Sequence, residues 1–520
     1  MPYVRRAVRA NSGATLYEIG DADTCWISSD EFRQESEAAK QRTQAAGVPM
    51  LSNANWRALR VEAEQCEIES DSEAVVAEGP GWVGKDIFVF ADGSVYQSED
   101  DETEVIAAFD PDAAFGKEGT LLGWRKGFDR IMPDTPLITA LLSYGFVAPL
   151  LSIAPSNILN PQLELIGPAE SGKTIIAKAV MSIYGGDPDS ELGNGRSWDI
   201  SPMAFEGMRN LCRDCTLFLD ENSIQANNDD LIGQIAFAAS SSGSRTRFGD
   251  TQRKAAIRFA LLSTGNVPLS SRKLKSADVQ RAVKTRMISL QFDGPLITEV
   301  PEGFDTAREA MEELNAHCDR HYGTAIRTFV RKVTNSRRDD EAGFKDEVAG
   351  LMQRFKDRAP SVEHGSSRIL DTFALIYAAG RLAKKWKILP ERSADTMKSV
   401  RLLYRRATRA LMPVDQVQAI EVVTAVIKVS KADIYSAKRT EPKSAKPVRL
   451  GSLGTCIKFD DGSRRYYLLP DELNDRLGPD SQKHLRALRD AGILVNEGGR
   501  LTKKAPRIIV DNARVYELRF

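Results

Sequence analysis

The feature that most constrains this chain is the stretch 165–178, LIGPAESGKTIIAK, in which two apolar residues run into the pattern Gly-x-x-x-x-Gly-Lys-Thr. The strand-like segment QLELI leads into the pattern and a helical segment follows it, which is the context that a phosphate-binding loop requires. In such a loop, backbone N–H groups converge on phosphate oxygens and the following helix adds its dipole. The stretch therefore predicts a nucleotide site between a strand and a helix.

Two side chains of this loop have predicted roles of their own. Lys173 is expected to pair with the β- and γ-phosphates, and the Thr174 hydroxyl is expected to bind Mg²⁺. ATP and Mg²⁺ are therefore the predicted cofactors. The predicted nucleotide-binding residues are Gly167, Pro168, Ala169, Glu170, Ser171, Gly172, Lys173, Thr174 and Ile175.

A second motif, CTLFLDENS, is an apolar strand that ends in adjacent carboxylates, Asp220 and Glu221. Asp220 is expected to hold Mg²⁺ through water, and Glu221 to polarise an attacking water. Because the ordinary pKa of a glutamate is about 4.3, Glu221 would be ionised at neutral pH and able to act as a base. The pair predicts hydrolysis rather than phosphoryl transfer to a second substrate.

Two further strands carry candidate catalytic residues. IRFALLSTGN ends at Asn266, which is expected to orient the water from the other side, with Thr264 as the alternative residue. Arg286 directly precedes the strand MISLQFD, where a ring-forming ATPase would reach the neighbouring subunit's nucleotide with an arginine finger. Arg281 is the competing finger, and a surface arginine at a helix C-terminus remains an alternative interpretation of Arg286.

The segment SSSGSRTRFGDTQRKAAIRF predicts a basic hairpin between the second and third strands. Such a hairpin, projecting into the channel of a ring, could grip the phosphate backbone of DNA. The alternative is an edge hairpin whose charges prevent aggregation. The predicted nucleic-acid contacts are Arg245, Arg247, Arg253 and Lys254.

Composition limits the setting of this site. The net charge of −1 means that any nucleic-acid surface must be local. Six scattered cysteines suit a reducing cytoplasm better than a disulfide framework, and no apolar stretch follows the basic N-terminus as a signal peptide would require. Residues 137–154 approach the length of a membrane span but contain Ser, Tyr, Gly and Pro, and they are expected to form a buried helix. The predicted location is cytoplasmic, without a membrane partner.

At 520 residues, the chain is expected to form several domains. The alternation of strand-like and helical segments around the phosphate loop predicts an α/β core with a parallel sheet and helices on both faces. A basic, proline-interrupted stretch, 430–452, is expected to be a linker or exposed loop. The predicted divisions are a β-rich N-terminal domain at 1–115, the ATPase core at 116–295, a helical lid at 296–412, and a basic linker with a winged-helix-like C-terminal domain at 413–520.

Several motifs between about residues 78 and 395 stand in the order of a known bacterial family. They resemble the ATPase domain of a family first classed only as a domain of unknown function, whose members include Cch-type, MCM-like replicative helicases of mobile genetic elements. The motifs are PGWVGKDIFVFADG, GWRKG, LIGPAESGKT, SPMAFEGMRNLCRDCTLFLDE, FALLSTGN, AHCDRHYG and SSRILDTFALIYAAGRLAKKW.

The resemblance implies an AAA+ P-loop ATPase that assembles into a ring, with a hexamer expected, and translocates along DNA. It also implies that Arg368, which opens a predicted helix, approaches ATP from the lid in the manner of a sensor-2 residue. One departure is STGN, where many relatives have STGE, and this difference affects the role assigned to Asn266. The resemblance supports roles for Lys173, Thr174, Asp220, Glu221 and Asn266, and a hairpin contact around Arg253 and Lys254.

The sequence thus predicts an ATP-dependent, ring-forming DNA helicase or translocase that serves replication of a phage or other mobile element. The alternative is an ATP-switched remodelling or defence ATPase that acts on DNA or protein without processive unwinding. A small-molecule kinase fits less well, because the adjacent Asp220 and Glu221 and a lid-like helical region favour hydrolysis.

Overall fold

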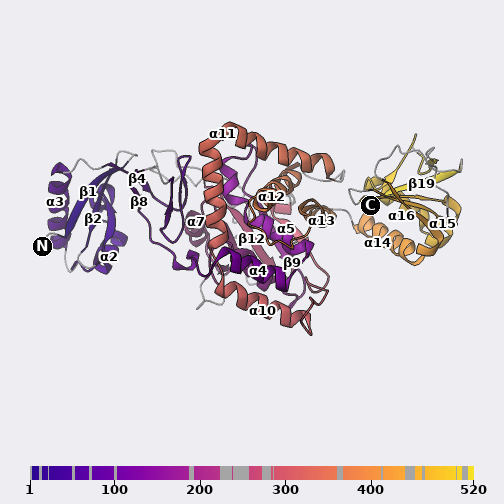
Figure 1. Cartoon of the computed structure of the whole chain (residues 1–520), viewed down its shortest axis with the longest axis horizontal. Helices are drawn as coiled ribbons and strands as arrows, with labels where there is room; N and C mark the ends of the chain where they lie inside the picture. Colours follow the sequence, from indigo (N-terminus) through magenta and orange to yellow (C-terminus); the bar gives the residue numbers. More distant parts are fainter. Residues whose placement is uncertain are drawn as a thin grey trace.

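The computed structural model arranges the chain as three bodies along one long axis, with the N-terminal body at one end and the C-terminal body at the other (Figure 1). The phosphate loop belongs to the central body. The residues that the structure describes are 3–10, 14–20, 23–49, 53–69, 73–98, 102–186, 192–222, 237, 257–271, 283–284, 286–359, 367–411, 414–439, 451–459, 463–498, 500–505 and 513–520.

The N-terminal body contains a mixed five-stranded sheet and three helices. The strands, in the order β3-β2-β1-β4-β8, are Cys25–Ser28, Thr15–Ile19, Val4–Ala10, Glu73–Ala77 and Val105–Ala107. The helices are α1 Ser29–Arg33, α2 Glu37–Ala45 and α3 Asn53–Glu69. Strands were predicted here, but α3 was not: most of the acidic run 61–73 lies in this helix, which packs on β1 through Trp56, Leu59 and Ala63.

A small antiparallel sheet joins this body to the central one. Its strands are β5 Gly81–Val83, β6 Ile87–Val89 and β7 Val95–Tyr96, which pair as two antiparallel hairpins, in keeping with the β-rich character predicted for residues 1–115. The backbone N–H of Trp82 donates to Asp214 Oδ2 at 3.0 Å, and its indole Nε1 donates to the Pro149 carbonyl at 2.9 Å. The linking sheet is thereby fixed to the core.

The central body is built on the predicted parallel sheet. Its strands, in the order β10-β11-β12-β9-β13, are Arg196–Ser197, Thr216–Asp220, Ala260–Gly265, Gln162–Ile166 and Ile288–Gln291. All four neighbouring pairs run parallel, so the C-terminal ends of the strands meet at one edge. Strand β12 separates β9, which carries the phosphate loop, from β11, which ends in Asp220.

Helices surround this sheet. Before β9 stand α4 Leu121–Ile131, α5 Pro136–Gly145 and the short 3-10 helix Ala148–Ser152. Residues 137–150 are buried as expected, but the single helix predicted over 137–154 is divided, since α5 ends at Gly145 and a 3-10 helix covers Ala148–Ser152. Among the described residues, no helix has both the length and the apolar character needed to cross a membrane. The remaining helices of the core are α6 Lys173–Met181 and α7 Pro202–Leu211.

The region after β13 is helical, as expected from its apolar spacing. Its long helices are α10 Ala307–Arg320, α11 Thr324–Arg358, α12 Ser367–Lys385 and α13 Thr396–Arg409. Helix α10 packs on α6 and α4, and α13 packs on both α5 and the edge strand β13. Helix α11 is kinked at Asp340, whose φ of −159° and ψ of 90° are not helical.

The C-terminal body combines three helices with a second mixed sheet. The helices are α14 Val414–Val429, α15 Pro470–Leu477 and α16 Ser481–Asp490. The strands are β14 Ile434–Arg439, β15 Gly454–Phe459, β16 Arg464–Leu468, β17 Leu494–Val495, β18 Lys503–Lys504 and β19 Arg514–Arg519. The linker expected at 430–452 is wrong in its first part, because residues 434–439 form strand β14 and pair in parallel with β15.

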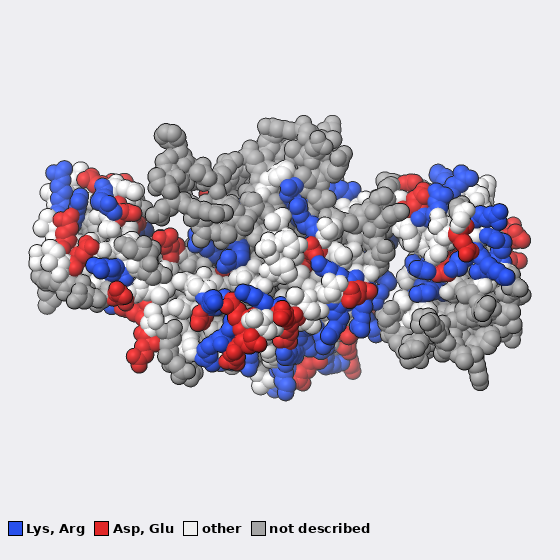
Figure 2. All heavy atoms as spheres, turned by 90° about the horizontal axis from the view of Figure 1, so that it is seen from above, with Lys and Arg blue, Asp and Glu red and all other residues white. Residues whose placement is uncertain are grey.

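Charge is distributed unevenly among the bodies. Residues 1–115 contain 9 Lys and Arg against 23 Asp and Glu, whereas residues 413–520 contain 20 Lys and Arg against 14 Asp and Glu. Figure 2 shows Lys and Arg side chains gathered over the described part of the C-terminal body on the face in view. The overall charge of −1 thus conceals an acidic end and a basic end.

Candidate nucleotide site

The phosphate loop follows β9 and leads directly into α6. Glu170 and Gly172 have positive φ angles of 59° and 87°, which turn the chain so that the helix begins at Lys173. A Cβ atom added to Gly167 would lie 3.1 Å from the carbonyl oxygen of Phe292, so the first glycine of the loop allows close packing against the end of β13. Glycine is favoured at both 167 and 172 by these constraints.

The Lys173 ammonium is held within the loop. It donates hydrogen bonds to the carbonyl oxygens of Gly167 (3.0 Å) and Pro168 (2.6 Å), and to Asn266 Oδ1 (3.3 Å). Lys173 is only 6% exposed. This burial lowers its pKa, and the nearby negative charges of Glu221 and Asp220 oppose that effect in part.

Asp220 lies within reach of both neighbouring loops. The Thr174 hydroxyl donates to Asp220 Oδ1 at 3.0 Å, and the Thr264 hydroxyl donates to the same oxygen. Hydroxyl and carboxylate oxygens are ligands that suit Mg²⁺. The side chains of Thr174 and Asp220 therefore fit the predicted metal site.

Glu221 follows Asp220 in an unusual backbone conformation. Its φ is 61°, a left-handed value that costs free energy for a residue with a Cβ atom. Its backbone N–H donates to Thr264 Oγ1 at 3.0 Å. Thr264 thus receives a bond from Glu221 and gives one to Asp220, and it ties the two carboxylate residues to the tip of β12.

The structure brings both candidate residues of β12 to the site, but with different partners. Asn266, the first choice from the sequence, contacts the Lys173 ammonium. Thr264, the alternative, contacts Asp220 and Glu221. This division follows from strand register, because Leu219 pairs with Ser263 and the next positions, 220 and 264, are therefore opposite each other.

Two residues of this region were not predicted, Asn222 and Glu164. Asn222 is fully buried, and its Nδ2 donates to the Val267 carbonyl at 3.1 Å and to Glu164 Oε2 at 3.4 Å. The signal for Glu164 was a charged residue in the middle of the apolar strand QLELI. Charged residues are seldom fully buried unless they are paired.

Arg286 lies apart from the phosphate loop of its own chain, within electrostatic range of Arg368. In the pairing of β13 with β9, Gln291 is opposite Ile166 at the loop edge, whereas Arg286 precedes Ile288 at the other edge of the sheet. The Arg286 guanidinium lies 4.4 Å from the centre of the Phe237 ring. Burial lowers its pKa, and the positive charge of Arg368 lowers it further.

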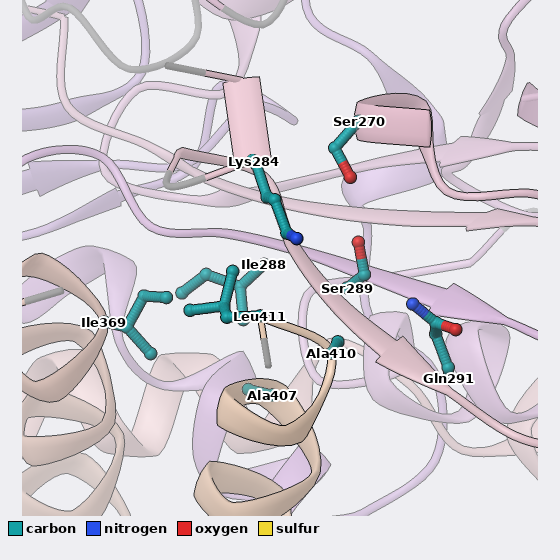
Figure 3. A pocket seen from close by; sticks show the side chains of 9 residues that line it. All are labelled: Ser270, Lys284, Ile288, Ser289, Gln291, Ile369, Ala407, Ala410 and Leu411. Atoms are coloured by element: carbon teal, nitrogen blue, oxygen red, sulfur yellow. The ribbon is translucent and has the colours of Figure 1, made fainter. Parts of the chain in front are cut away.

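A pocket runs along the edge strand β13, where α12 and α13 pack against the sheet. Figure 3 shows Lys284 directed toward Ser289, with Ile369 and the end of α13 on the opposite side. The pocket therefore joins the strand that follows Arg286 to the helix that begins beside Arg368. Its lining residues are Ser270, Lys284, Ile288, Ser289, Gln291, Ile369, Ala407, Ala410 and Leu411.

The remaining predicted site residues lie outside the residues that the structure describes. They are the hairpin residues Arg245, Arg247, Arg253 and Lys254, together with the competing finger Arg281. Their roles stay predictions.

Comparison with known proteins gives a match to a family model over part of the chain and a similar fold in a solved structure. Residues 18–254 match the family model described as "Domain of unknown function (DUF927)". No curated protein matches the chain. Among solved structures, "SCCmec type IV Cch - active helicase" is similar with a TM-score of 0.53 at 13% identity, over 99% of this chain and 92% of that one.

Two structures of the NrS-1 C-terminal region also match, but with TM-scores too low to support an argument. One has a TM-score of 0.27 at 10% identity, over 66% of this chain and 75% of that one. The other has a TM-score of 0.28 at 10% identity, over 68% of this chain and 76% of that one. The resemblance that the motifs predicted is confirmed, since residues 18–254 match the DUF927 family model and the chain has a fold similar to that of the Cch helicase.

Proposed function

We propose that this protein is an ATP-dependent, ring-forming DNA helicase or translocase with an AAA+ core, which serves replication of a phage or other mobile element. The observation that carries the proposal is the convergence of five side chains at one edge of the parallel sheet. They are Lys173 and Thr174 from the phosphate loop, Asp220 and Glu221 from β11, and Thr264 from β12.

Each of these side chains has a task in hydrolysis. Lys173 pairs with the phosphates, and Asn266, which accepts a hydrogen bond from it, orients its ammonium. Thr174 and Asp220 would hold Mg²⁺, which supplies charge neutralisation for the phosphates when bound. Glu221 accepts a proton from the attacking water, and Thr264 fixes the position of Glu221 through its backbone.

Arg286 and Arg368 act on the nucleotide of a neighbouring subunit in this proposal. Arg286 precedes β13 at the edge of the sheet opposite the phosphate loop, so it is poorly placed to serve the loop of its own chain, and Arg368 is near enough for its charge to affect Arg286. Two arginines held beside each other favour an anion between or near them. In a closed ring, with six subunits expected from the resemblance, the arginine finger of every subunit faces the phosphate loop of the next subunit.

The hairpin predicted at 245–254 supplies the DNA contacts in this proposal. The segment that contains it leaves the sheet after Glu221 and returns at β12, the strand that carries Thr264. A change at the hydrolytic site would therefore displace both ends of the segment. The grip is expected to be on phosphates, through Arg245, Arg247, Arg253 and Lys254.

The domain divisions follow from the same proposal. The regions 1–115, 116–295, 296–412 and 413–520 would be an N-terminal domain, the AAA+ core, its lid and a winged-helix-like domain. The order of β9, β12 and β11, with a polar strand tip between the loop and the acidic pair, supports the assignment of the core. Helices α15 and α16, followed by β17 to β19, support the winged-helix assignment.

The test combines two variants with a helicase assay on forked DNA. Lys173→Ala should abolish ATP hydrolysis and unwinding, because it removes the phosphate partner. Arg253→Ala/Lys254→Ala should retain basal ATPase activity but lose stimulation by DNA and strand displacement. A matched control is Arg308→Ala/Lys345→Ala, which removes two basic residues that pair with Glu312 and Glu341 on helix surfaces.

Three outcomes would decide between functions. Unwinding by Lys173→Ala at the wild-type rate would refute the ATP-driven mechanism. Normal unwinding by the hairpin variant would refute the hairpin contact. ATP hydrolysis without strand displacement by the wild-type protein would favour the alternative, an ATP-switched remodelling or defence ATPase.

A further inference from the structure

Glu164 is a fully buried carboxylate in the strand that leads to the phosphate loop. It lies in the middle of β9, three positions before Gly167, and is 0% exposed. Its neighbours across the sheet are Ser263 on β12 and Ser289 on β13. Burial of a carboxylate is costly unless hydrogen bonds replace its hydration, so its partners indicate what it does.

The described partners of Glu164 come from three different segments around the site. Its Oε2 accepts hydrogen bonds from the Leu269 backbone N–H (3.2 Å) and from Asn222 Nδ2 (3.4 Å). The Ser289 hydroxyl donates to Oε1. Glu164 thus connects the loop after β12, the residue after Glu221, and the strand that follows Arg286.

Asn222 transmits this connection to the hydrolytic glutamate. It directly follows Glu221 and is 0% exposed. Its side chain lies over Gly265, where an added Cβ atom would be 2.0 Å from Asn222 Oδ1. Only glycine at 265 leaves room for this amide, which reaches both Glu164 and the Val267 carbonyl.

The backbone of Glu221 is therefore held from both sides. On one side, its N–H is bonded to Thr264 Oγ1. On the other side, Asn222 is fixed by Glu164 and Val267. A left-handed φ of 61° at a glutamate persists only when the surrounding structure enforces it.

We propose that Glu164 is a positioning residue for hydrolysis, which acts through Asn222 to hold Glu221 in its left-handed conformation. This inference rests on the proposed ATPase function. It predicts that loss of the carboxylate changes the rate of hydrolysis but not the binding of nucleotide, since the loop from Gly167 to Thr174 keeps its own contacts.

The chemistry of the three partners gives a rescue variant. In Glu164→Gln, the amide oxygen can accept from Asn222 and Leu269, and the amide Nε2 can donate to the Ser289 hydroxyl. Glu164→Leu fills a similar volume but leaves these donors without their acceptor. The matched control is Gln162→Leu, a buried polar residue on the same strand and the same face, two positions further from the phosphate loop.

The experiment compares these variants in the full chain. We would measure kcat of ATP hydrolysis, the Kd of a fluorescent ATP analogue, and thermal unfolding. Glu164→Leu should lower kcat by about 10- to 100-fold with the Kd changed by less than about twofold. Glu164→Gln should recover most of kcat, and Gln162→Leu should keep it even where it lowers thermal stability.

Asn222→Ala tests the Glu164–Asn222 contact from its other side and leaves the sequence of β9 unaltered. It should lower kcat to a similar extent, and the double variant with Glu164→Leu should be no slower than the slower single variant. A normal kcat in Glu164→Leu or Asn222→Ala, or additive losses in the double variant, would overturn the proposal. A wild-type protein that binds ATP without hydrolysing it would instead overturn the proposed function.

Discussion

At the scale of single residues, the polar contacts from the tip of β12 are divided between two side chains. Thr264 contacts Asp220 and Glu221, whereas Asn266 contacts Lys173. Thr264→Ala should lower kcat by about 10- to 100-fold, because it removes bonds to both Asp220 and Glu221. Asn266→Ala should act mainly on KM, because its partner is Lys173. Steady-state ATPase kinetics separate the two, with Thr264→Ser as the conservative control. A larger loss of kcat in Asn266→Ala than in Thr264→Ala would contradict this division.

The burial of the Lys173 ammonium predicts that ATP binding is coupled to proton uptake. Its pKa is lowered in the free protein by burial, and bound phosphates should raise it again. ATP binding should therefore take up protons at alkaline pH, and affinity should fall as the pH rises above the lowered pKa. Calorimetry in buffers of different ionisation enthalpy measures this uptake. Lys173→Arg, which stays charged, should show none; equal uptake in both proteins would refute the assignment.

The residues predicted from the sequence are those whose chemistry is encoded locally. The phosphate loop and the Asp220–Glu221 pair are contiguous motifs, and the structure brings them together. Asn222 and Glu164 were missed because their contact depends on the register of strands that are far apart in the chain. Nothing in the segment around either residue specifies the other.

At the scale of elements, the linking sheet is held in part by Asp214, a buried carboxylate that pairs with the half-buried Arg258. Asp214 is 2% exposed and accepts from Arg258 Nε at 2.8 Å and from the Trp82 N–H at 3.0 Å. Burial raises the pKa of Asp214, and the Arg258 charge offsets this only in part. The pair is therefore more important for fixing the position of β5 than for net stability.

Removing one partner of this pair should nevertheless be costly. Asp214→Ala leaves Arg258 and the Trp82 N–H without their acceptor, and should lower the free energy of unfolding by about 3 kcal/mol. The control is Glu391→Ala, which removes an exposed partner of Arg125 and should cost less than about 1 kcal/mol. Denaturant unfolding followed by tryptophan fluorescence measures both. Equal costs would show that the linking sheet does not depend on Asp214.

Elements were predicted well where side-chain periodicity carries the signal. The strands of the central sheet and helices α10 to α13 have strong apolar patterns and were expected. Helix α3 was missed because acidic residues cover its exposed face and only a narrow stripe is buried. Strand β14 was missed because it is a polar edge strand, which is held by backbone pairing with β15 rather than by apolar side chains.

At the scale of the whole molecule, the placement of Arg286 predicts complementation between defective subunits. Arg286→Ala should lower ATPase activity by about 10³-fold or more while ATP still binds. Lys173→Ala should be inactive for a different reason, since its phosphate loop is defective although its Arg286 is intact. Subunits of the two kinds assembled together should regain activity, because some interfaces then combine an intact loop with an intact finger.

The control for complementation is a mixture of Lys173→Ala with Arg308→Ala, in which activity should only be diluted. The measurement is ATPase activity across mixing ratios at constant total protein. Failure of Arg286→Ala and Lys173→Ala to complement, when mass measurements show mixed assemblies, would place Arg286 outside the shared site. Arg368→Ala should behave in the same way if the two arginines act together.

The order of the three bodies could be anticipated from composition, but their contacts could not. The acidic N-terminal part, the α/β core and the basic C-terminal part were distinguishable along the chain. The contact of Trp82 with Asp214 and Pro149, which joins two of these parts, involves residues separated by more than sixty positions. Periodicity within a segment carries no information about such pairs.

The uneven charge of the chain gives the molecule a dipole moment along its length. The acidic N-terminal part and the basic C-terminal part of the sequence lie at opposite ends of the longest axis (Figure 1), so a uniform description as nearly neutral is misleading. In an external field the separated charges produce a torque, and near a polyanion they attract one end while they repel the other. Screening confines this effect to about 10 Å at moderate ionic strength. A phosphate backbone within this distance orients the molecule so that its basic C-terminal end faces the phosphates before any residue makes contact.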